Sequence, residues 1–232
     1  MGIADNVAEI RERVARAARR SGRSDNDVVL MGVSKTFPAA AIREAYSAGI
    51  RVFGENRVQE FFEKTPQLGE LPDAKWHLIG HLQSNKSSKA AELFHAVDTV
   101  DSLRLAERLN VAAASLHRIL DVLIEINIGA EEAKAGLQPN SSGLEEILLA
   151  IPRLNNLTVL GFMAIPPFTE NPEDARPYFR QLRELRDATS TRHLPGVELE
   201  VLSMGMSHDF EVAIEEGSNC VRIGTALFGG RH

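Results

Sequence analysis

Residues 28–38 read VVLMGVSKTFP, and this stretch indicates the fold class of the chain. Val28 to Val33 form a short apolar run rich in β-branched residues, which is typical of a buried strand. A helical segment follows from Pro38, because proline is favoured in the first helical turn, where its missing N–H has no partner. Lys35 therefore lies where a parallel strand ends and a βα loop begins, the edge at which α/β folds bind ligands.

Two interpretations of Lys35 follow from this position. A lysine held at the mouth of an apolar strand is partly desolvated, which lowers its pKa and frees the amine to attack a carbonyl. The alternative is an ordinary solvated loop lysine. On this stretch alone the ordinary interpretation is favoured, since perturbed groups are a minority among charged residues.

Length and composition narrow the class of protein. The 232 residues suffice for one α/β barrel or one doubly wound domain with a sizeable core. A net charge of −6 argues against binding to nucleic acid or to an anionic membrane surface. The single cysteine, Cys220, excludes an internal disulfide and lies in an apolar run, as expected of a buried structural thiol in a reducing compartment. No signal peptide or membrane-spanning run is visible, so a cytoplasmic protein is expected.

Strand and helix signals alternate along the chain. An amphipathic helix is predicted over Ile3 to Arg20, before the first strand, where it could cover one end of a barrel. Each strand signal that follows leads into a helical signal; the predicted strands are 28–34, 51–54, 75–80, 96–100, 119–128, 157–165, 198–203 and 219–223. Alternating βα units imply a parallel sheet, and eight of them imply a closed (β/α)₈ barrel of the TIM type. Residues 1–232 are expected to form one domain.

The loops after the last two predicted strands offer a phosphate site. Barrels of this class often bind phosphate with these loops and the N-terminus of a short helix. Here the first loop runs from Ser203 to Ser207, and the second contains Gly224 and Thr225. The alternative is that Ser207 and Thr225 are ordinary helix N-caps. Acidic residues at 209 and 211 would repel a phosphate unless they point outward.

Arg222 lies inside the eighth predicted strand, where a charged side chain needs a partner. Either a structural ion pair or a ligand in the barrel mouth would supply it. Strands one and eight are neighbours in a closed barrel, so Lys35, Arg222 and the phosphate loops converge on one opening. A phosphorylated aldehyde satisfies all three, and pyridoxal 5′-phosphate is the obvious candidate.

Other candidates are weaker. Asn56 follows the second strand and is suited either to bind a ligand or to cap the next helix. His77 and His81 have i,i+4 spacing but lie on a strand and its turn, without the glutamate of a helical zinc motif. No metal site is predicted.

Six segments resemble the pyridoxal phosphate homeostasis protein family (YggS/PROSC-type). They are GVSKTFP at 32–38, FGENRVQE at 53–60, WHLIGHLQSNK at 76–86, GFMAIPP at 161–167, LSMGMSHDFEVAI at 202–214 and VRIGTALFG at 221–229. The resemblance implies a fold-type III barrel like the N-terminal domain of alanine racemase, with the cofactor held as a Schiff base on Lys35. It also implies Arg222 facing the pyridine nitrogen, phosphate contacts from Ser207, Gly224 and Thr225 with Ser203 nearby, and Asn56 and Met163 beside the ring. Arg57 and His208 depart from the family pattern, and these departures are expected to leave the cofactor contacts intact and to affect only the rim.

A carrier with little or no catalysis is the expected function, and no residue is assigned a catalytic role. An arginine opposite the ring nitrogen disfavours protonation there, so carbanion chemistry is poorly supported. Racemisation needs a second base, and the two tyrosines, Tyr46 and Tyr178, fall inside predicted helices. The resemblance implies intracellular pyridoxal phosphate homeostasis, with apoenzymes that use this cofactor as expected partners.

Two enzyme alternatives remain open. One is a racemase or lyase of fold type III that uses pyridoxal phosphate. The other is a class I aldolase, with a sugar phosphate on Lys35. The predicted helix faces show no clear apolar patch, which leaves the oligomeric state open between a monomer and a weak dimer.

Overall fold

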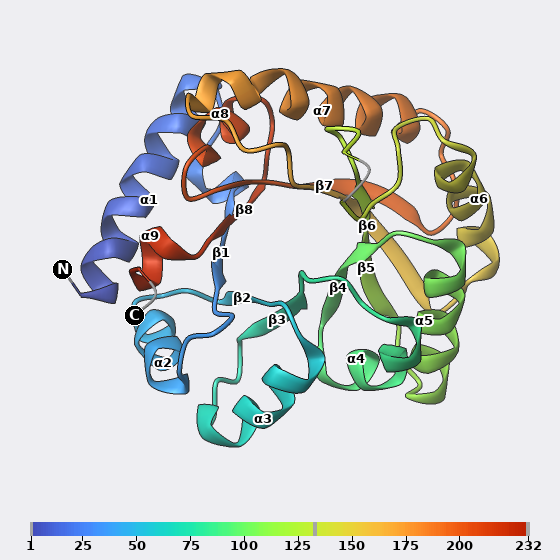
Figure 1. The fold of residues 1–232 in the computed structure, drawn as a ribbon, viewed down its shortest axis with the longest axis horizontal. Helices are drawn as coiled ribbons and strands as arrows, with labels where there is room; N and C mark the ends of the chain where they lie inside the picture. The colour runs from blue at the N-terminus through green and yellow to red at the C-terminus, as the bar shows by residue number, and fades with distance from the viewer. Residues whose placement is uncertain (1, 132–133, 231–232) are drawn as a thin grey trace.

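The computed structural model describes residues 2–131 and 134–230. Within these residues, eight parallel strands close into a barrel in chain order, with β8 paired back to β1, which confirms the predicted (β/α)₈ fold (Figure 1). The strands are β1 (Val29–Val33), β2 (Val52–Glu55), β3 (Lys75–Leu78), β4 (Ala96–Val100), β5 (Leu120–Ile126), β6 (Leu157–Ala164), β7 (Val197–Met206) and β8 (Cys220–Ile223).

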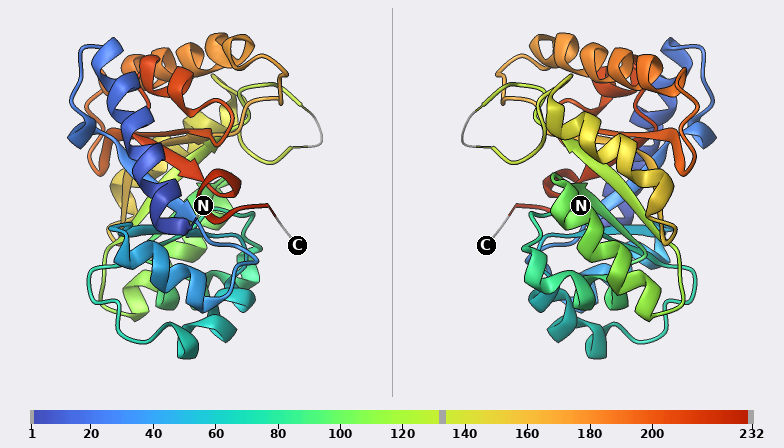
Figure 2. Two further views of the ribbon diagram at one scale, coloured as in Figure 1. Left: turned by 90° about the vertical axis from the view of Figure 1, so that its left-hand side faces the viewer. Right: turned by 90° about the vertical axis from the view of Figure 1, so that its right-hand side faces the viewer.

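Helices surround this barrel (Figure 1). They are α1 (Ile3–Arg20), α2 (Ala39–Ser47), α3 (Val58–Leu68), α4 (Ser87–Leu93), α5 (Leu103–Ser115), α6 (Ser142–Ala150), α7 (Arg176–Ser190), α8 (Phe210–Glu215) and α9 (Thr225–Phe228). The described parts of the segments that follow β5 and β6 project from one end of the barrel (Figure 2). Among the described helices, none combines the length and the hydrophobicity that a membrane span requires.

The helix α1 does not cover an end of the barrel, so that expectation was wrong. It lies in the outer ring between α8, α9 and α2 (Figure 1). The final βα unit ends in α9, a helix of four residues, which is too short to cover β8 and β1. The buried face of α1, formed by Val7, Ile10, Val14, Ala17 and Ala18, fills that part of the ring instead.

The boundary between β7 and α8 differs from the prediction, and this difference affects the candidate site. The sequence predicts a helix beginning at Ser207, but β7 continues to Met206 and α8 begins only at Phe210. Asp209 is the N-cap residue of α8, and its carboxylate oxygen Oδ1 accepts a hydrogen bond from the Met206 amide at 2.7 Å. Ser207 is therefore a loop residue and not the N-cap of that helix.

The strands alternate between the barrel axis and the helices. On the helix side, Phe53 stacks on Trp76 with ring centroids 5.0 Å apart, and Phe61 of α3 lies 4.7 Å from the same indole. On β6, a Cβ at Gly161 would lie 1.8 Å from the Val201 carbonyl oxygen of β7. Only glycine therefore lets the two strands lie this close together. That contact fixes the register that places Met163 beside Ser203.

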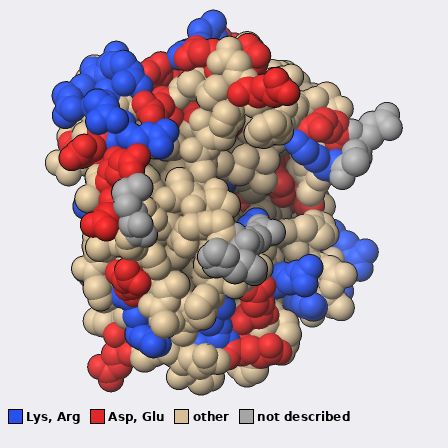
Figure 3. Space-filling model, turned by 60° about the vertical axis from the view of Figure 1, so that its left-hand side comes forward, with Lys and Arg blue, Asp and Glu red and all other residues tan. Residues whose placement is uncertain are grey.

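Arginine–glutamate pairs hold α1, α7 and α8 together. The side chain of Glu216 is 7% exposed and accepts hydrogen bonds from Arg176, Arg180 and Arg183 at 3.0–3.2 Å. Basic and acidic side chains gather side by side at the upper left of Figure 3, near the C-terminal end of α1. Burial alone would raise the pKa of Glu216, but the hydrogen bonds from Arg180 and Arg176 hold that pKa below its ordinary value.

We expect Glu216→Gln to lower the free energy of unfolding at pH 7 by about 2 kcal/mol, because charge-assisted bonds to a buried carboxylate are lost. A depressed carboxyl pKa stabilises the fold above the pKa of the unfolded chain, so this deficit should shrink as the pH falls below about 4. Urea denaturation at several pH values measures it. Glu173→Gln is the control: that residue binds the same Arg176 but is 57% exposed, so less than about 1 kcal/mol is expected. Equal losses in the two variants would contradict the prediction.

Candidate functional site

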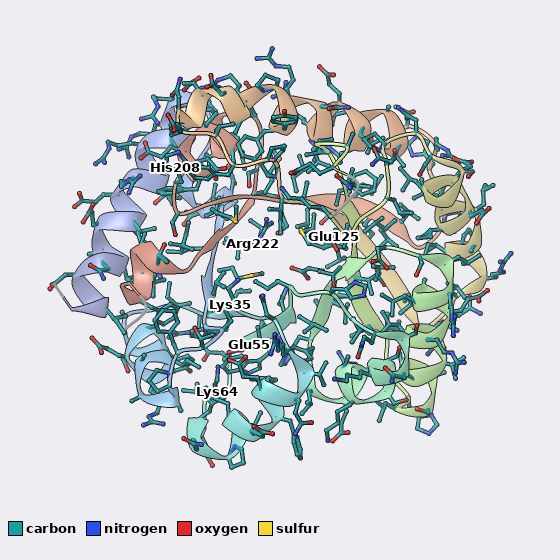
Figure 4. The ribbon with its side chains drawn as sticks, viewed as in Figure 1. Lys35, Glu55, Lys64, Glu125, His208 and Arg222 are labelled. Carbon is teal, nitrogen blue, oxygen red and sulfur yellow. The ribbon has the colours of Figure 1, made fainter. Side chains whose placement is uncertain are left out.

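The carboxyl end of the barrel brings most of the predicted site residues together. A Cβ at Gly54 would meet the Met31 sulfur at 2.9 Å inside the barrel, whereas a Cβ at Gly32 would meet Phe53 on the helix side. Met31 and Val33 therefore face the axis, and by alternation so does Lys35, two residues beyond. Lys35, Arg222 and Glu125 surround the central opening in Figure 4.

Arg222 is held rigidly beside that opening. It is 4% exposed, and its guanidinium donates to the Ser203 carbonyl at 2.6 Å, the Ser203 hydroxyl at 2.8 Å and the Ala164 carbonyl at 2.9 Å. Burial holds the pKa of Arg222 below its ordinary value, while nearby carboxylates act in the other direction. Among the described residues no carboxylate forms an ion pair with it, so the structural ion pair considered from the sequence is not what holds this arginine.

The two loops predicted to bind phosphate touch each other. The Ser207 hydroxyl accepts a hydrogen bond from the Ala226 amide at 3.3 Å, which joins the β7–α8 loop to the start of α9. Neither Ser207 nor Thr225 is an N-cap; Gly224 occupies that position for α9. The N-cap alternative for both residues is therefore excluded.

The two acidic residues beside this loop both have partners within the protein. The carboxylate of Asp209 is turned back onto the Met206 amide. Glu211 forms ion pairs with Arg13 at 2.8 Å and Arg20 at 3.0 Å on the outside of the ring. The repulsion of a phosphate foreseen at position 211 is absent, since that side chain points away from the loop.

The remaining predicted residues also lie at this end. Asn56 follows β2, and it does not cap α3, because the N-cap is Arg57 and makes no side-chain cap bond. Met163 is fully buried and pairs in register with Glu125 on one side and Ser203 on the other. The exposed His208 lies at the rim, 5.5 Å from the Phe168 ring.

Glu125 was not predicted from the sequence. This β5 residue is 9% exposed, and its carboxylate oxygen Oε2 is buried without a hydrogen-bond partner in the described structure. Burial raises its pKa to about 7, helped by Asp101 and opposed by Arg222 and His81. The sequence did contain a signal for Glu125, because it is a charged residue inside the apolar run IEINI. Arg222 was identified from the same kind of signal, a charged residue inside a predicted strand.

Other titratable groups inside the barrel are paired or inert. The His77 ring nitrogen Nδ1 lies 3.0 Å from a carboxylate oxygen of the fully buried Asp98. Burial raises the pKa of the Cys220 thiol to about 12, as expected of a structural cysteine. No cluster of three potential metal ligands occurs among the residues that the structure describes.

The sequence and the fold are similar to those of known proteins. Residues 6–232 match the family model described as "Alanine racemase, N-terminal domain". The chain is 48% identical over 231 residues to the pyridoxal phosphate homeostasis protein of Aquifex aeolicus, covering 100% of this chain and 99% of that one. The chain belongs to the pyridoxal phosphate homeostasis protein family. The family resemblance inferred from the six motifs is thereby confirmed.

Solved structures agree with this family. PipY of Synechococcus elongatus, solved with pyridoxal phosphate bound, has a TM-score of 0.84 and 39% identity, covering 98% of this chain and 100% of that one. The same protein solved without pyridoxal phosphate also has a TM-score of 0.84. An alanine racemase from Clostridium difficile has a TM-score of 0.72 at 18% identity, covering 98% of this chain and 57% of that one, which shows a shared fold.

Proposed function

We propose that this protein binds pyridoxal 5′-phosphate as a Schiff base on Lys35 and buffers or delivers it, with little or no catalysis. One observation carries the proposal: Lys35 and Arg222 extend from the neighbouring strands β1 and β8 toward one opening, beside two loops joined through Ser207. Pyridoxal phosphate, when bound, supplies an aldehyde that a lysine amine attacks and a phosphate that such loops hold. The PipY relative bound to this cofactor supports the assignment.

The residues of the mouth fit this ligand. The buried carboxyl oxygen Oε2 of Glu125 has no hydrogen-bond partner among the described residues, and Glu125 faces the opening, as a group directed toward a ligand would. Ser207, Gly224 and Thr225 would hold the phosphate, and Asn56 and Met163 would lie beside the ring.

Arg222 would face the pyridine nitrogen. The hydroxyl of Ser203 already accepts a bond from this guanidinium, so we assign Ser203 to orienting Arg222 and not to the phosphate. A guanidinium in this place disfavours a second positive charge on the ring nitrogen, which weakens the cofactor as an electron sink.

The tyrosines do not supply a second base at the mouth. Tyr46 lies in α2, where its hydroxyl bonds to Asp73, and Tyr178 lies in α7. Relatives named homeostasis proteins support the same non-catalytic role. We therefore propose a carrier that passes the cofactor to apoenzymes, acting as one domain over residues 1–232.

One observation favours a second candidate function. Glu125 exchanges its proton near neutral pH and faces the opening, which is what a second base in a racemase or lyase would require. An enzyme of fold type III that uses pyridoxal phosphate is therefore the alternative. No observation favours the aldolase.

An absorbance spectrum of the purified protein, followed by borohydride reduction and peptide mass spectrometry, tests the proposal. A yellow protein whose colour is bleached by borohydride, with the label on Lys35, is expected. A colourless protein that is trapped only with added sugar phosphate would contradict it. Turnover of free amino acids at ordinary enzymatic rates would replace the carrier with the enzyme alternative.

We expect Ser207→Ala to weaken the binding of pyridoxal phosphate about tenfold, because the variant loses both a phosphate donor and the link between the two loops. Fluorescence or absorbance titration measures the dissociation constant. Ser190→Ala, at the end of α7, is the control and should leave binding unchanged. Unaltered affinity in Ser207→Ala would remove this loop from the phosphate site.

A further inference from the structure

A second lysine lies behind the loop that carries Lys35. Lys64 belongs to α3, and its side chain is 10% exposed (Figure 4). Its Nζ atom donates to the Glu55 carboxylate at 2.8 Å and to the Ser34 carbonyl at 3.1 Å, and lies 3.5 Å from the Glu60 carboxylate. A buried ammonium with three oxygen neighbours is a fixed point in the structure, unlike a solvated lysine.

Through these oxygens Lys64 is linked to both chain neighbours of Lys35. Ser34 comes directly before Lys35, and its hydroxyl also donates to the Glu55 carboxylate at 2.7 Å. Thr36 comes directly after, and its amide donates to the Glu60 carboxylate at 2.7 Å. Lys64 therefore holds the residue before Lys35 directly and the residue after it through Glu60.

The backbone of Thr36 needs such support. Its φ is +66°, a left-handed conformation that is unfavourable for a β-branched residue. Residues in this region persist where the surrounding contacts determine them, and they cluster at ligand sites. The bond from the Thr36 amide to Glu60 is a contact of this kind, and Lys64 holds the Glu60 carboxylate in place.

Lys64 itself lies on the helix side of the sheet. Glu55 and Phe53 are two residues apart on β2, so their side chains lie on the same face of the sheet. This face is the helix side, because Phe53 packs against Trp76 and Phe61 of α3 packs against the same indole. The Lys64 amine is thus separated from the opening by the strand ends, so it acts on the loop and not on a ligand.

We propose that Lys64 is a positioning residue that sets the direction and reactivity of the Lys35 amine. This inference rests on the proposed function, in which Lys35 carries the cofactor. Without the Lys64 ammonium, Ser34 and Glu60 lose their common anchor and the loop adopts other conformations. Small misplacements of a reacting group have large effects on rate, because the reacting atoms must meet within a narrow range of geometry.

The test separates covalent attachment from binding. In Lys64→Met, the rate of Schiff-base formation with added pyridoxal 5′-phosphate should fall on the order of tenfold or more. The affinity for pyridoxine 5′-phosphate, which has the phosphate but no aldehyde, should stay within about twofold of wild type. A purely structural role for Lys64 would change both together or neither. Lys89→Met, which removes a more exposed lysine from α4, should match wild type in both measurements.

If Lys64→Met does not fold, a second pair of variants tests the same proposal. Glu60→Ala removes the acceptor of the Thr36 amide at a partly exposed position, and Glu60→Gln retains an oxygen there. Slow attachment in Glu60→Ala that is restored in Glu60→Gln supports the proposal. Wild-type rates in folded Lys64→Met, or in Glu60→Ala, would overturn it. Wild-type protein labelled at a lysine other than Lys35 would instead overturn the proposed function and this inference with it.

Discussion

Lys35→Ala is expected to abolish the covalent attachment of pyridoxal 5′-phosphate and to leave the barrel folded. The side chain follows β1 at the surface of the opening and is only partly buried, so its removal creates no large cavity in the core. The phosphate loops around Ser207 and Gly224 are unchanged in the variant, so weak non-covalent binding should remain.

Three measurements check this expectation. The absorbance band of the Schiff base should be absent, borohydride should fix no label on the protein, and the thermal unfolding midpoint should stay close to that of wild type. Lys86→Ala, at an exposed position, is the matched control and should retain full labelling. Undiminished labelling of Lys35→Ala would show that the aldehyde reacts with another amine, and the proposed site would then be wrong.

Glu125→Gln is expected to raise the free energy of unfolding of the ligand-free protein by about 3 kcal/mol at pH 8. Burial raises the pKa of Glu125 from 4.5 to about 7, and each unit corresponds to about 1.4 kcal/mol. Between pH 4.5 and about pH 7, the unfolded chain has released the Glu125 proton and the native protein still holds it. Wild-type stability therefore falls as the pH rises from about 4.5 to 7, and the deficit persists above pH 7.

The neutral amide of glutamine has no such proton to lose. The difference between variant and wild type should therefore be small near pH 4, grow across the window and level off above pH 7. Urea denaturation at intervals from pH 4 to pH 8 measures this profile. Glu146→Gln, at an exposed position in α6, should give a flat difference. A flat profile for Glu125→Gln would show that this carboxyl titrates normally.

The strand order could be predicted because it depends on local composition. Runs such as Val28 to Val33 are apolar and β-branched, and such runs fit a buried strand wherever they lie. Their number and the intervening helices then leave a closed parallel barrel as the simplest arrangement, and the eight strands of the structure confirm it. The strand ends in turn placed Lys35, Asn56 and Arg222 at one edge.

Some boundaries could not be predicted because local signals compete with pairing between strands. Ser207 is a residue type favoured at helix N-caps. However, β7 extends to Met206, because Met206 pairs with Arg222 of the neighbouring strand β8. The place of α1 depended on the shortness of α9, which becomes apparent only when the ring of helices closes.

The sequence by itself determined the alternation of strands and helices, the family, and the residues at the strand ends, because these depend on neighbours along the chain. The tertiary structure alone decided what the buried charged side chains touch, and it buried Glu125 and Lys64 as well as the predicted Arg222. Glu60 and Lys64 have the i,i+4 spacing of a solvated ion pair, and only the packing of α3 against β1 and β2 turns Lys64 into an anchor for the Lys35 loop. Glu125 lies in one strand, while the burial that shifts its pKa comes from the strands that close around it.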